Sequence, residues 1–407
     1  MVHKKVLILG AVQGEVPLVE AFQELGYYVI VAGKGSNYPC CSIADKFYDV
    51  DIMDYELILK IAKEENVCAV TSNVVERAIR VVAYVTEKLG LESIGYEIAQ
   101  IFTNKYKMRQ AAEKAGVGVP KYTEVSNVEQ ALDFAKSCKY PLIIKPVDNG
   151  GSKGIQKVES DEQLVCYFNE SLKMSVSDAS VIIEQFIEGE EYIVDAFTHN
   201  YTCDNTDLST KRKFNLSKNF VSKAVIIQDA DSCDTKVEKA LLETNKKLVE
   251  GIGLRFGITH GEYIYNQKED KVYLVEITAR GGGVYLASHL TPLATGINVN
   301  KLLALYSLGY DVLGEKHLKL KKGSAAWYAF ALPEGEIVSV EGIVQAKTIP
   351  GVYDIIDSSF YVGKKVKELV DDSGKFGPII ISAETRDKCD EVFGEVQEVL
   401  KIGVKTA

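Results

Sequence analysis

The sequence predicts a protein of the α/β and α+β classes, with a doubly wound parallel sheet in its N-terminal part. The first observation is an apolar run at 5–10 that ends in glycine, as expected of a buried parallel strand. The second is a helical stripe of apolar residues at 18, 21, 22 and 25, followed by another apolar run at 28–32. The third is that this alternation continues to residue 90, whereas short strands with glycine and proline follow residue 323.

Further elements are expected in order along the chain. Helices are predicted at 56–65, 76–89, 105–115, 128–138, 237–252 and 297–308, with a last amphipathic helix around 392–400. Strands are predicted at 67–71, 141–146, 181–186, 192–197, 258–265, 271–278, 327–332, 337–346 and 379–382. Residues 199–219 are polar and irregular, so we expect a surface loop there.

The composition is that of an ordinary globular protein, with 46% hydrophobic and 26% charged residues among 407. This length suits roughly two to four domains. The net charge of −10 argues against a nucleic-acid-binding surface. No apolar run is long enough for a signal peptide or a membrane span, and none of the eight cysteines forms a Cys-x-x-Cys pair. We therefore expect a cytoplasmic protein with reduced thiols.

The turn after the first strand, Gly10–Gly14, does not match a dinucleotide-binding fingerprint. It has two glycines at a different spacing, and Gly33–Gly35 stands where an acid would bind the ribose. We expect a tight strand-to-helix turn that can hold part of a substrate, rather than an NAD site.

Two acids are expected to share one face of a hairpin. If 266–270 form the turn and 265 pairs with 271, then 262 pairs with 274 and 260 with 276. Glu262 and Glu276 are then diagonal neighbours, with Cβ atoms roughly 7 Å apart. Two such carboxylates suit one or two Mg²⁺ ions, whereas a register shifted by one would turn them apart. His260 beside them is either a substrate contact or a structural residue.

The strand that carries Glu276 continues into Thr278, Arg280 and the glycines 281–283. Alternate side chains of a strand share a face, so Glu276, Thr278 and Arg280 point to the same side. Arg280 suits a carboxylate or a developing acyl phosphate, and the glycines allow a close backbone approach. A surface ion pair is the alternative, and His289 is a further candidate for substrate contact.

Two upstream segments suit a nucleotide. Lys145 ends an apolar strand, and the glycine-rich loop 149–154 follows it. Glycines let backbone N–H groups surround phosphate oxygens while lysine supplies a charge, although a mobile hairpin would have the same pattern. The stretch 184–191 begins as a strand and becomes acidic, which suits an adenine edge and ribose hydroxyls, or else a solvated turn.

In this order, these pieces resemble the ATP-grasp superfamily. They are most similar to the group that contains biotin carboxylase, the carbamoyl-phosphate synthase large chain, glycinamide-ribonucleotide-type ligases and L-amino-acid ligases. The resemblance covers nearly the whole chain and rests on Asn104–Arg109, Ile144–Pro146, the glycine loop, Glu184, the Glu262/Glu276 pair and Arg280. It implies a pre-ATP-grasp domain at 1–100, an ATP-grasp domain at 101–310 with a flap subdomain at about 118–190, and a C-terminal lobe at 311–407 that completes the core.

The resemblance also implies a role for each matched position. ATP would be bound by Lys105, Lys145, Asn149, Gly150, Gly151, Ser152, Gly154, Glu184, Gln185, Phe186, Ile187 and Glu191. Mg²⁺, with Mn²⁺ as an alternative, would be held by Glu262, Glu276 and Thr278, and substrate by Arg280, Gly281, Gly282, His260 and His289. Arg280 and Lys145 would be the catalytic residues. Many members have Asn at the position of Thr278, and a hydroxyl is the poorer metal ligand, so the number of metal ions stays open.

The implied function is an ATP-dependent, ADP-forming carbon–nitrogen ligase. It would activate a small carboxylate as an acyl phosphate and join it to an amine, namely an amino acid or an amino-acid derivative. A bicarbonate-activating carboxylase or a carbamoyl-phosphate synthase-like enzyme is one alternative, and a nucleotide-binding module without turnover is another. The expected partners are small molecules, with no nucleic acid and no membrane. The group that the chain resembles is often dimeric, so a homodimer is one oligomeric state that the resemblance allows, and the sequence alone does not decide it.

Overall fold

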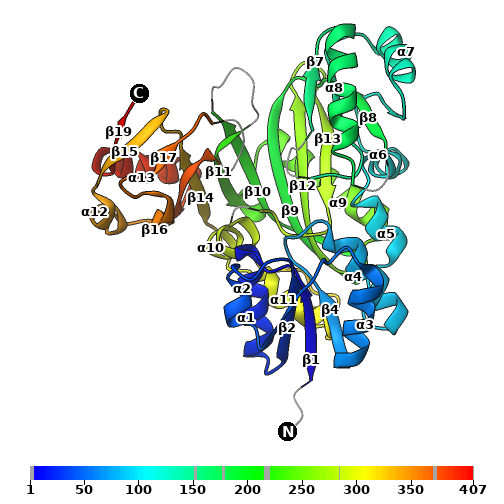
Figure 1. Cartoon of the computed structure of the whole chain (residues 1–407), viewed down its shortest axis with the longest axis horizontal. Helices are drawn as coiled ribbons and strands as arrows, with labels where there is room; N and C mark the ends of the chain where they lie inside the picture. The colour runs from blue at the N-terminus through cyan, green and yellow to red at the C-terminus, as the bar shows by residue number, and fades with distance from the viewer. Residues whose placement is uncertain are drawn as a thin grey trace.

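The computed structural model describes residues 4–150, 154–176, 179–214, 221–283, 285–369 and 374–406. Figure 1 shows the N-terminal sheet below, a long central sheet, a small lobe at the upper right and the C-terminal region at the left. The eight cysteines are free thiols. No helix within these ranges is long and apolar enough to cross a bilayer.

The N-terminal domain is a parallel sheet in the order β3-β2-β1-β4, as the alternating pattern predicts. Its strands are β1 (Lys5–Leu9), β2 (Tyr28–Gly33), β3 (Lys46–Asp49) and β4 (Val67–Thr71). Its helices are η1 (Gln13–Glu15), α1 (Val16–Glu24), α2 (Cys40–Ile43), α3 (Tyr55–Glu65) and α4 (Ala78–Leu89). Residues 6–9 of β1 are fully buried because helices cover both faces of the sheet.

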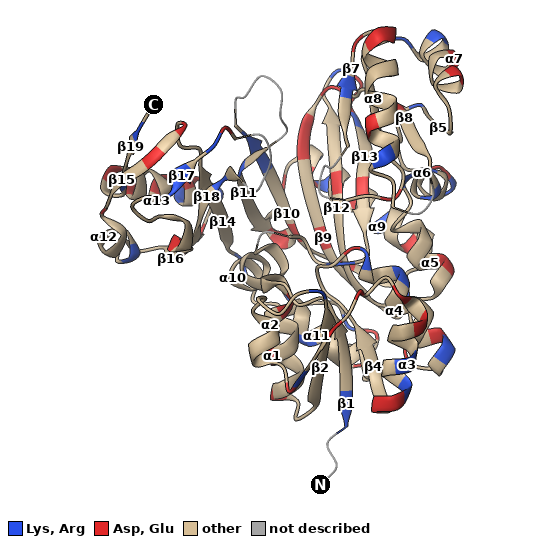
Figure 2. Cartoon of the chain, viewed as in Figure 1, with Lys and Arg blue, Asp and Glu red and all other residues tan. Residues whose placement is uncertain are grey.

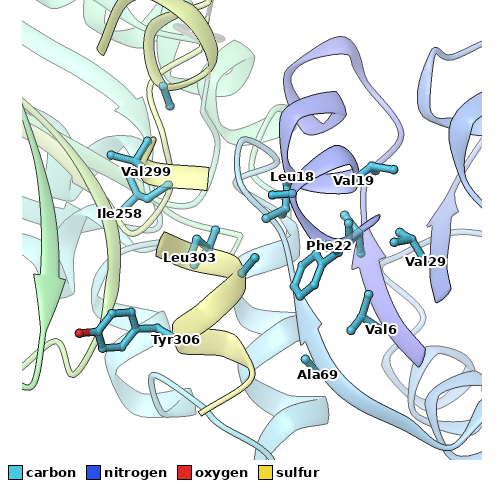
Figure 3. Packing of buried hydrophobic residues seen from close by; sticks show 14 of the residues in the cluster. Val6, Leu18, Val19, Phe22, Val29, Ala69, Ile258, Val299, Leu303 and Tyr306 are labelled. Atoms are coloured by element: carbon cyan, nitrogen blue, oxygen red, sulfur yellow. The ribbon is translucent and has the colours of Figure 1, made fainter. Parts of the chain in front are cut away.

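A helix from much later in the chain closes one face of this domain. Leu18 and Phe22 of α1 belong to the same buried cluster as Leu303 of α11 (Val299–Ser307) (Figure 3). The shared apolar core fixes the N-terminal sheet against the segment that follows Arg280.

The small lobe is a four-stranded antiparallel sheet in the order β5-β8-β6-β7. Helices α5 (Tyr96–Ile101) and α6 (Lys105–Lys114) lead into it. The N-cap of α6 is Asn104, whose side chain accepts from the Lys107 N–H. The lobe contains β5 (Tyr122–Val125), α7 (Val128–Cys138), β6 (Leu142–Pro146), β7 (Gln156–Val158), α8 (Asp161–Lys173) and β8 (Val181–Gln185). The flap subdomain expected at about 118–190 stays a prediction.

The central sheet has eight strands in the order β13-β12-β9-β10-β11-β14-β18-β16. Its first five strands are β9 (Glu190–His199), β10 (Thr202–Lys213), β11 (Ser222–Asp229), β12 (Gly257–Asn266) and β13 (Lys271–Thr278). After η2 (Ala230–Ser232), α9 (Lys236–Ile252) begins with a capping box of Thr235 and Glu238. β13 is the outer strand at one end of this sheet, so among the described residues no strand pairs with its other edge.

The expectation of a surface loop at 199–219 is wrong. Residues 202–213 form β10, which pairs with both β9 and β11 in the middle of the sheet. The alternation of apolar and polar residues fails here because several inward side chains are polar, including Thr206, Asp207 and Ser209, each no more than 1% exposed. Residues 215–220 lie outside the described residues.

The C-terminal region extends the central sheet and adds a small sheet, β17-β15-β19. Its strands are β14 (Ser324–Phe330), β15 (Gly335–Glu341), β16 (Val352–Ile355), β17 (Lys365–Val366), β18 (Phe376–Ala383) and β19 (Lys401–Lys405). Its helices are α12 (Ile343–Lys347), η4 (Asp357–Ser359) and α13 (Arg386–Val399). The predicted strand 337–346 ends early, because Gly342 has φ +84° and α12 follows it.

Candidate functional site

The two acids of the β12–β13 hairpin lie directly opposite each other. Asn266 pairs with Lys271, so the turn is one residue shorter than the sequence suggests, and this register alone would oppose Glu262 to Val275. A bulge at Val275 adds one residue to β13 and brings Glu276 opposite Glu262. The predicted register is therefore wrong, but the two carboxylates share one face.

Two lysines hold these carboxylates ionised. The Lys105 Nζ lies 2.6 Å from Glu276 Oε1, and the Lys211 Nζ lies 3.3 Å from both oxygens of Glu262. Partial burial alone would raise the pKa of Glu276, but Lys105 outweighs burial and the pKa is lowered. Burial likewise opposes ionisation of Glu262, yet Lys211 and His260 lower its pKa. The Glu262 side chain is 27% exposed and the Glu276 side chain is 25% exposed, so a cation can reach both carboxylates.

This pair fits a magnesium ion that completes its shell with phosphate oxygens and water, because Mg²⁺ commonly binds one or two carboxylates. No group of three His, Cys, Asp or Glu side chains in the described parts of the chain is arranged to hold a metal. Thr278 lies on β13 opposite His260, and its buried Oγ1 has no hydrogen-bond partner among the residues that the structure describes. That unpaired hydroxyl offers one further oxygen at the same end of the hairpin.

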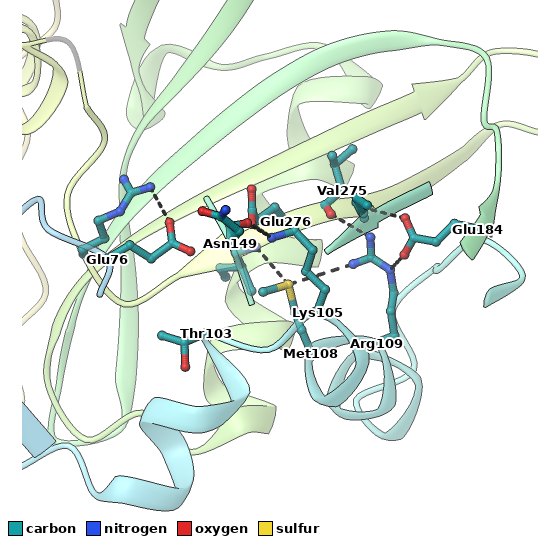
Figure 4. A network of polar contacts seen from close by, with 12 residues as sticks. Glu76, Thr103, Lys105, Met108, Arg109, Asn149, Glu184, Val275 and Glu276 are labelled. Carbon is teal, nitrogen blue, oxygen red and sulfur yellow. Dashed lines mark hydrogen bonds and ion pairs between the residues drawn. The ribbon is translucent and has the colours of Figure 1, made fainter. Parts of the chain in front are cut away.

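A second set of charges gathers at Glu184 on β8 (Figure 4). Its Oε1 lies 2.6 Å from Arg109 Nε, and its Oε2 lies 2.6 Å from Lys145 Nζ. Burial alone would raise the pKa of Glu184, but Arg109 and Lys145 lower it to about 2. Burial lowers the pKa of Lys145 despite that carboxylate. Since both oxygens of Glu184 are taken, a nucleotide here would meet the backbone and the neighbours Gln185, Phe186 and Ile187.

The glycine loop lies against Lys105. The Lys105 Nζ donates to the Asn149 carbonyl at 2.7 Å, and the Asn149 side chain donates to the Met174 carbonyl at 2.7 Å. A Cβ at Gly150 would lie 2.5 Å from Glu76 Oε2, so a larger residue here would displace the Glu76 carboxylate. Gly154 has φ +74°, and Gly151 and Ser152 lie outside the described residues.

Arg280 meets a partner from the N-terminal domain. Its Nη2 lies 3.0 Å from Glu76 Oε2, and its Nη1 donates to the Gly281 carbonyl at 2.8 Å. The Gly281 N–H donates to the Asn73 carbonyl at 2.7 Å. A Cβ at Gly281 or Gly282 would come within 3 Å of neighbouring side chains, so both glycines are needed for this close packing.

The two candidate histidines occupy different surroundings. His260 Nδ1 lies 2.6 Å from Asp195 Oδ1, and its Nε2 lies 3.7 Å from Glu262 Oε1. Burial would lower the pKa of His260, but Asp195 raises it to about 9. His289 lies in a π-helical turn, η3 (Leu286–Leu290), which α10 (Thr291–Thr295) follows. It contacts Ser288 Oγ at 2.8 Å and the ring of Tyr285.

A row of buried polar side chains continues from His260 across the sheet. Direct strand pairing joins Thr278, His260, Asp195, Asp207 and Asp229 on β13, β12, β9, β10 and β11. Burial, and then the charge of Asp195, raise the pKa of Asp207 to about 8. Its Oδ2 accepts from Thr291 Oγ1 at 3.0 Å, which ties the row to α10.

At the expected ribose end, Glu191 pairs with Lys213 and lies 4.0 Å from the Lys211 Nζ. Lys211 therefore lies between Glu191 and Glu262. Figure 2 shows the acidic residues along β9, β12 and β13.

Sequence reasoning missed several members of this site, namely Glu76, Arg109, Asp195, Asp207, Lys211 and Lys213. For Arg109 a signal existed, because it follows Lys105 by four residues and both must lie on one face of the helix. The lysines of β10 were missed because the strand itself was not recognised.

Comparison with known proteins identifies the family. The family described as "Carbamoyl-phosphate synthase L chain, ATP binding domain" matches residues 104–313, from the start of α6 past Arg280. The chain belongs to this ATP-grasp family. The matched range includes the Glu262/Glu276 pair, the glycine loop, and the lysines at 105, 145, 211 and 213.

Known relatives resemble the chain over different lengths. A urea amidolyase from Saccharomyces cerevisiae is 28% identical over 48% of this chain, but the match covers only 10% of that protein. A formate-dependent phosphoribosylglycinamide formyltransferase from Sulfurisphaera tokodaii is 26% identical over 86% of each chain. The crystal structure of an L-amino acid ligase from Bacillus licheniformis has a TM-score of 0.80 at 19% identity, with 99% of each chain covered. The ATP-grasp fold therefore extends through the whole chain.

Proposed function

We propose that this protein is an ADP-forming carbon–nitrogen ligase, which uses MgATP to activate a small carboxylate as an acyl phosphate and joins it to an amine. The observation that carries the proposal is the position of Lys105. Its ammonium group contacts both Glu276 of the acid pair and the carbonyl of Asn149 in the glycine loop. One cation thus lies between the residues suited to a metal and the loop suited to phosphates.

The ATP would lie between the small lobe and the central sheet. Lys105 and Lys145 would contact its phosphates, and the glycine loop would cover them. Gln185, Phe186 and Ile187 would line the adenine pocket beside the Glu184 backbone, and Glu191 would hold the ribose. Glu262 and Glu276, with Thr278 as the third oxygen, would hold Mg²⁺ or Mn²⁺, which supplies charge neutralisation at the phosphates when bound.

The carboxylate substrate would bind Arg280 beside Gly281 and Gly282. Fixed cations around the transferred phosphoryl group lower the barrier because they stabilise the charge that develops on its oxygens. Glu76, the present partner of Arg280, offers a carboxylate for the ammonium group of an amino acid. Two histidines complete the proposed substrate contacts, namely His260, which lies beside Glu262, and His289.

A phosphate-release screen tests this function. The purified protein is incubated with MgATP and pairs of acids and amines, including amino acids, and products are identified by mass. We expect phosphate release that requires both a carboxylate and an amine, with a new amide as product. Release stimulated by bicarbonate alone would favour a carboxylase, and no release with any pair would contradict the proposal.

A further inference from the structure

Arg109 is the most buried charged side chain beside the proposed ATP site. It lies on α6 one turn after Lys105 and has no exposed surface. A buried guanidinium costs free energy unless its donors are all paired, so its contacts indicate what it does. Figure 4 shows that these contacts reach two different sheets.

The first contact fixes Lys145 through Glu184. The Arg109 Nε donates to one oxygen of Glu184 at 2.6 Å, and Lys145 Nζ contacts the other oxygen at 2.6 Å. Two cations thus share one carboxylate, which leaves a net positive charge at this end of the site. Without Arg109, the carboxylate would be free to neutralise Lys145 alone and to turn toward it.

The second contact fixes the strand that carries Glu276. The Arg109 Nη2 donates to the Val275 carbonyl at 2.7 Å, at the bulge that brings Glu276 opposite Glu262. The preceding helix residue, Met108, accepts the Ile277 N–H at its sulfur at 3.3 Å. The backbone on both sides of Glu276 is therefore held by consecutive residues of α6. Since β13 is an outer strand, these groups have no neighbouring strand on that side within the described parts of the chain.

We propose that Arg109 is a positioning residue that sets Lys145 of the small lobe and Glu276 of the central sheet in place relative to each other. This inference rests on the proposed function, because it assigns Lys145 to phosphate and Glu276 to metal. The inference adds a residue that would contact neither the phosphates nor the metal ion. Arg109 would act on Lys145 through Glu184, and on Glu276 through the bulge at Val275.

Three variants separate the two contacts. Arg109→Lys keeps the charge but has a single nitrogen, which can reach only one of the two partners. Arg109→Met keeps much of the volume and removes both contacts. Glu184→Gln weakens the first contact and leaves the second. Arg386→Lys is the matched control, because Arg386 also pairs with a carboxylate, Glu238 at 3.2 Å, between α13 and α9.

MgATP affinity by calorimetry and the Mg²⁺ concentration for half-maximal ATP turnover are measured for each folded protein. Both Arg109 variants are expected to bind MgATP at least about tenfold more weakly, since a charged hydrogen bond contributes at least that factor. They should also need more Mg²⁺, whereas Glu184→Gln should weaken ATP binding without changing the Mg²⁺ requirement. Arg386→Lys should change neither quantity.

A lower melting temperature of Arg109→Lys with unchanged MgATP affinity and Mg²⁺ requirement would show a merely structural role and overturn the inference. If Arg109→Met does not fold, Arg109→Lys alone decides, because it retains the buried charge. A wild-type protein that does not bind MgATP would instead contradict the proposed function, so the two failures are distinguishable.

Discussion

Glu276 is the residue at which most contacts of the site meet. Glu262 faces it across the hairpin, Lys105 neutralises it, and α6 holds the backbone on both sides. The sequence predicts that the two acids share a face, because alternation along each strand is visible in the residues themselves. It cannot predict the bulge at Val275, whose carbonyl is bound by a residue 166 positions away. Glu76 cannot be predicted as a member of the site for the same reason, since its partner Arg280 lies 204 positions away in the sequence.

Glu276→Gln tests this residue. The change keeps the shape and removes the charge proposed to hold the metal, so we expect ATP turnover to fall by roughly a hundredfold or more. Activity is measured per folded protein, because Lys105 loses its buried partner and stability will fall as well. Glu269→Gln, in the turn of the same hairpin, is the control and should retain activity. Equal activity of the two variants would remove Glu276 from the proposed metal site.

At the scale of elements, β10 is where sequence and structure differ most. The segment that forms β10 is predicted as a loop because its buried positions carry Thr206, Asp207 and Ser209 in place of apolar residues. Of these three, Asp207 belongs to the row of buried polar side chains that crosses the sheet from His260. Strands with apolar inward positions, such as β1 and β4, were placed to within one residue at each end. A strand whose buried face is polar has no such signal.

Asp207→Asn tests the protonation of this row. The folded pKa of Asp207 is raised to about 8, far above the ordinary value of 3.8, so the unfolded chain releases this proton at lower pH than the folded protein. The stability of the native protein should therefore fall as pH rises from about 4 to about 8, by up to about 1.4 kcal/mol per pH unit from this group. Asparagine resembles the protonated acid, so the stability of the variant relative to wild type should increase over that range. Urea unfolding at several pH values measures the free energy of unfolding of both proteins. If the value of the variant minus that of wild type stays constant or decreases as pH rises, the expected protonation of Asp207 is contradicted.

At the scale of the whole molecule, the N-terminal domain is part of the candidate site. Its core continues into α11, and the segment after β4 brings Glu76 to Arg280 and Asn73 to Gly281. The doubly wound sheet could be predicted because each βα unit has its own local pattern. The joining of β14, β16 and β18 to the central sheet could not, because strand order depends on packing between distant segments. The domain limits at 100 and 310 stay a prediction.

The central claim is that a carboxylate oxygen attacks ATP to form an acyl phosphate. It is tested most directly with the acid found in the phosphate-release screen, labelled with oxygen-18 in its carboxyl group. The account predicts that the phosphate released during amide formation carries one labelled oxygen from the acid, because displacement by the amine leaves that oxygen on phosphorus. Amide formation with unlabelled phosphate would contradict it.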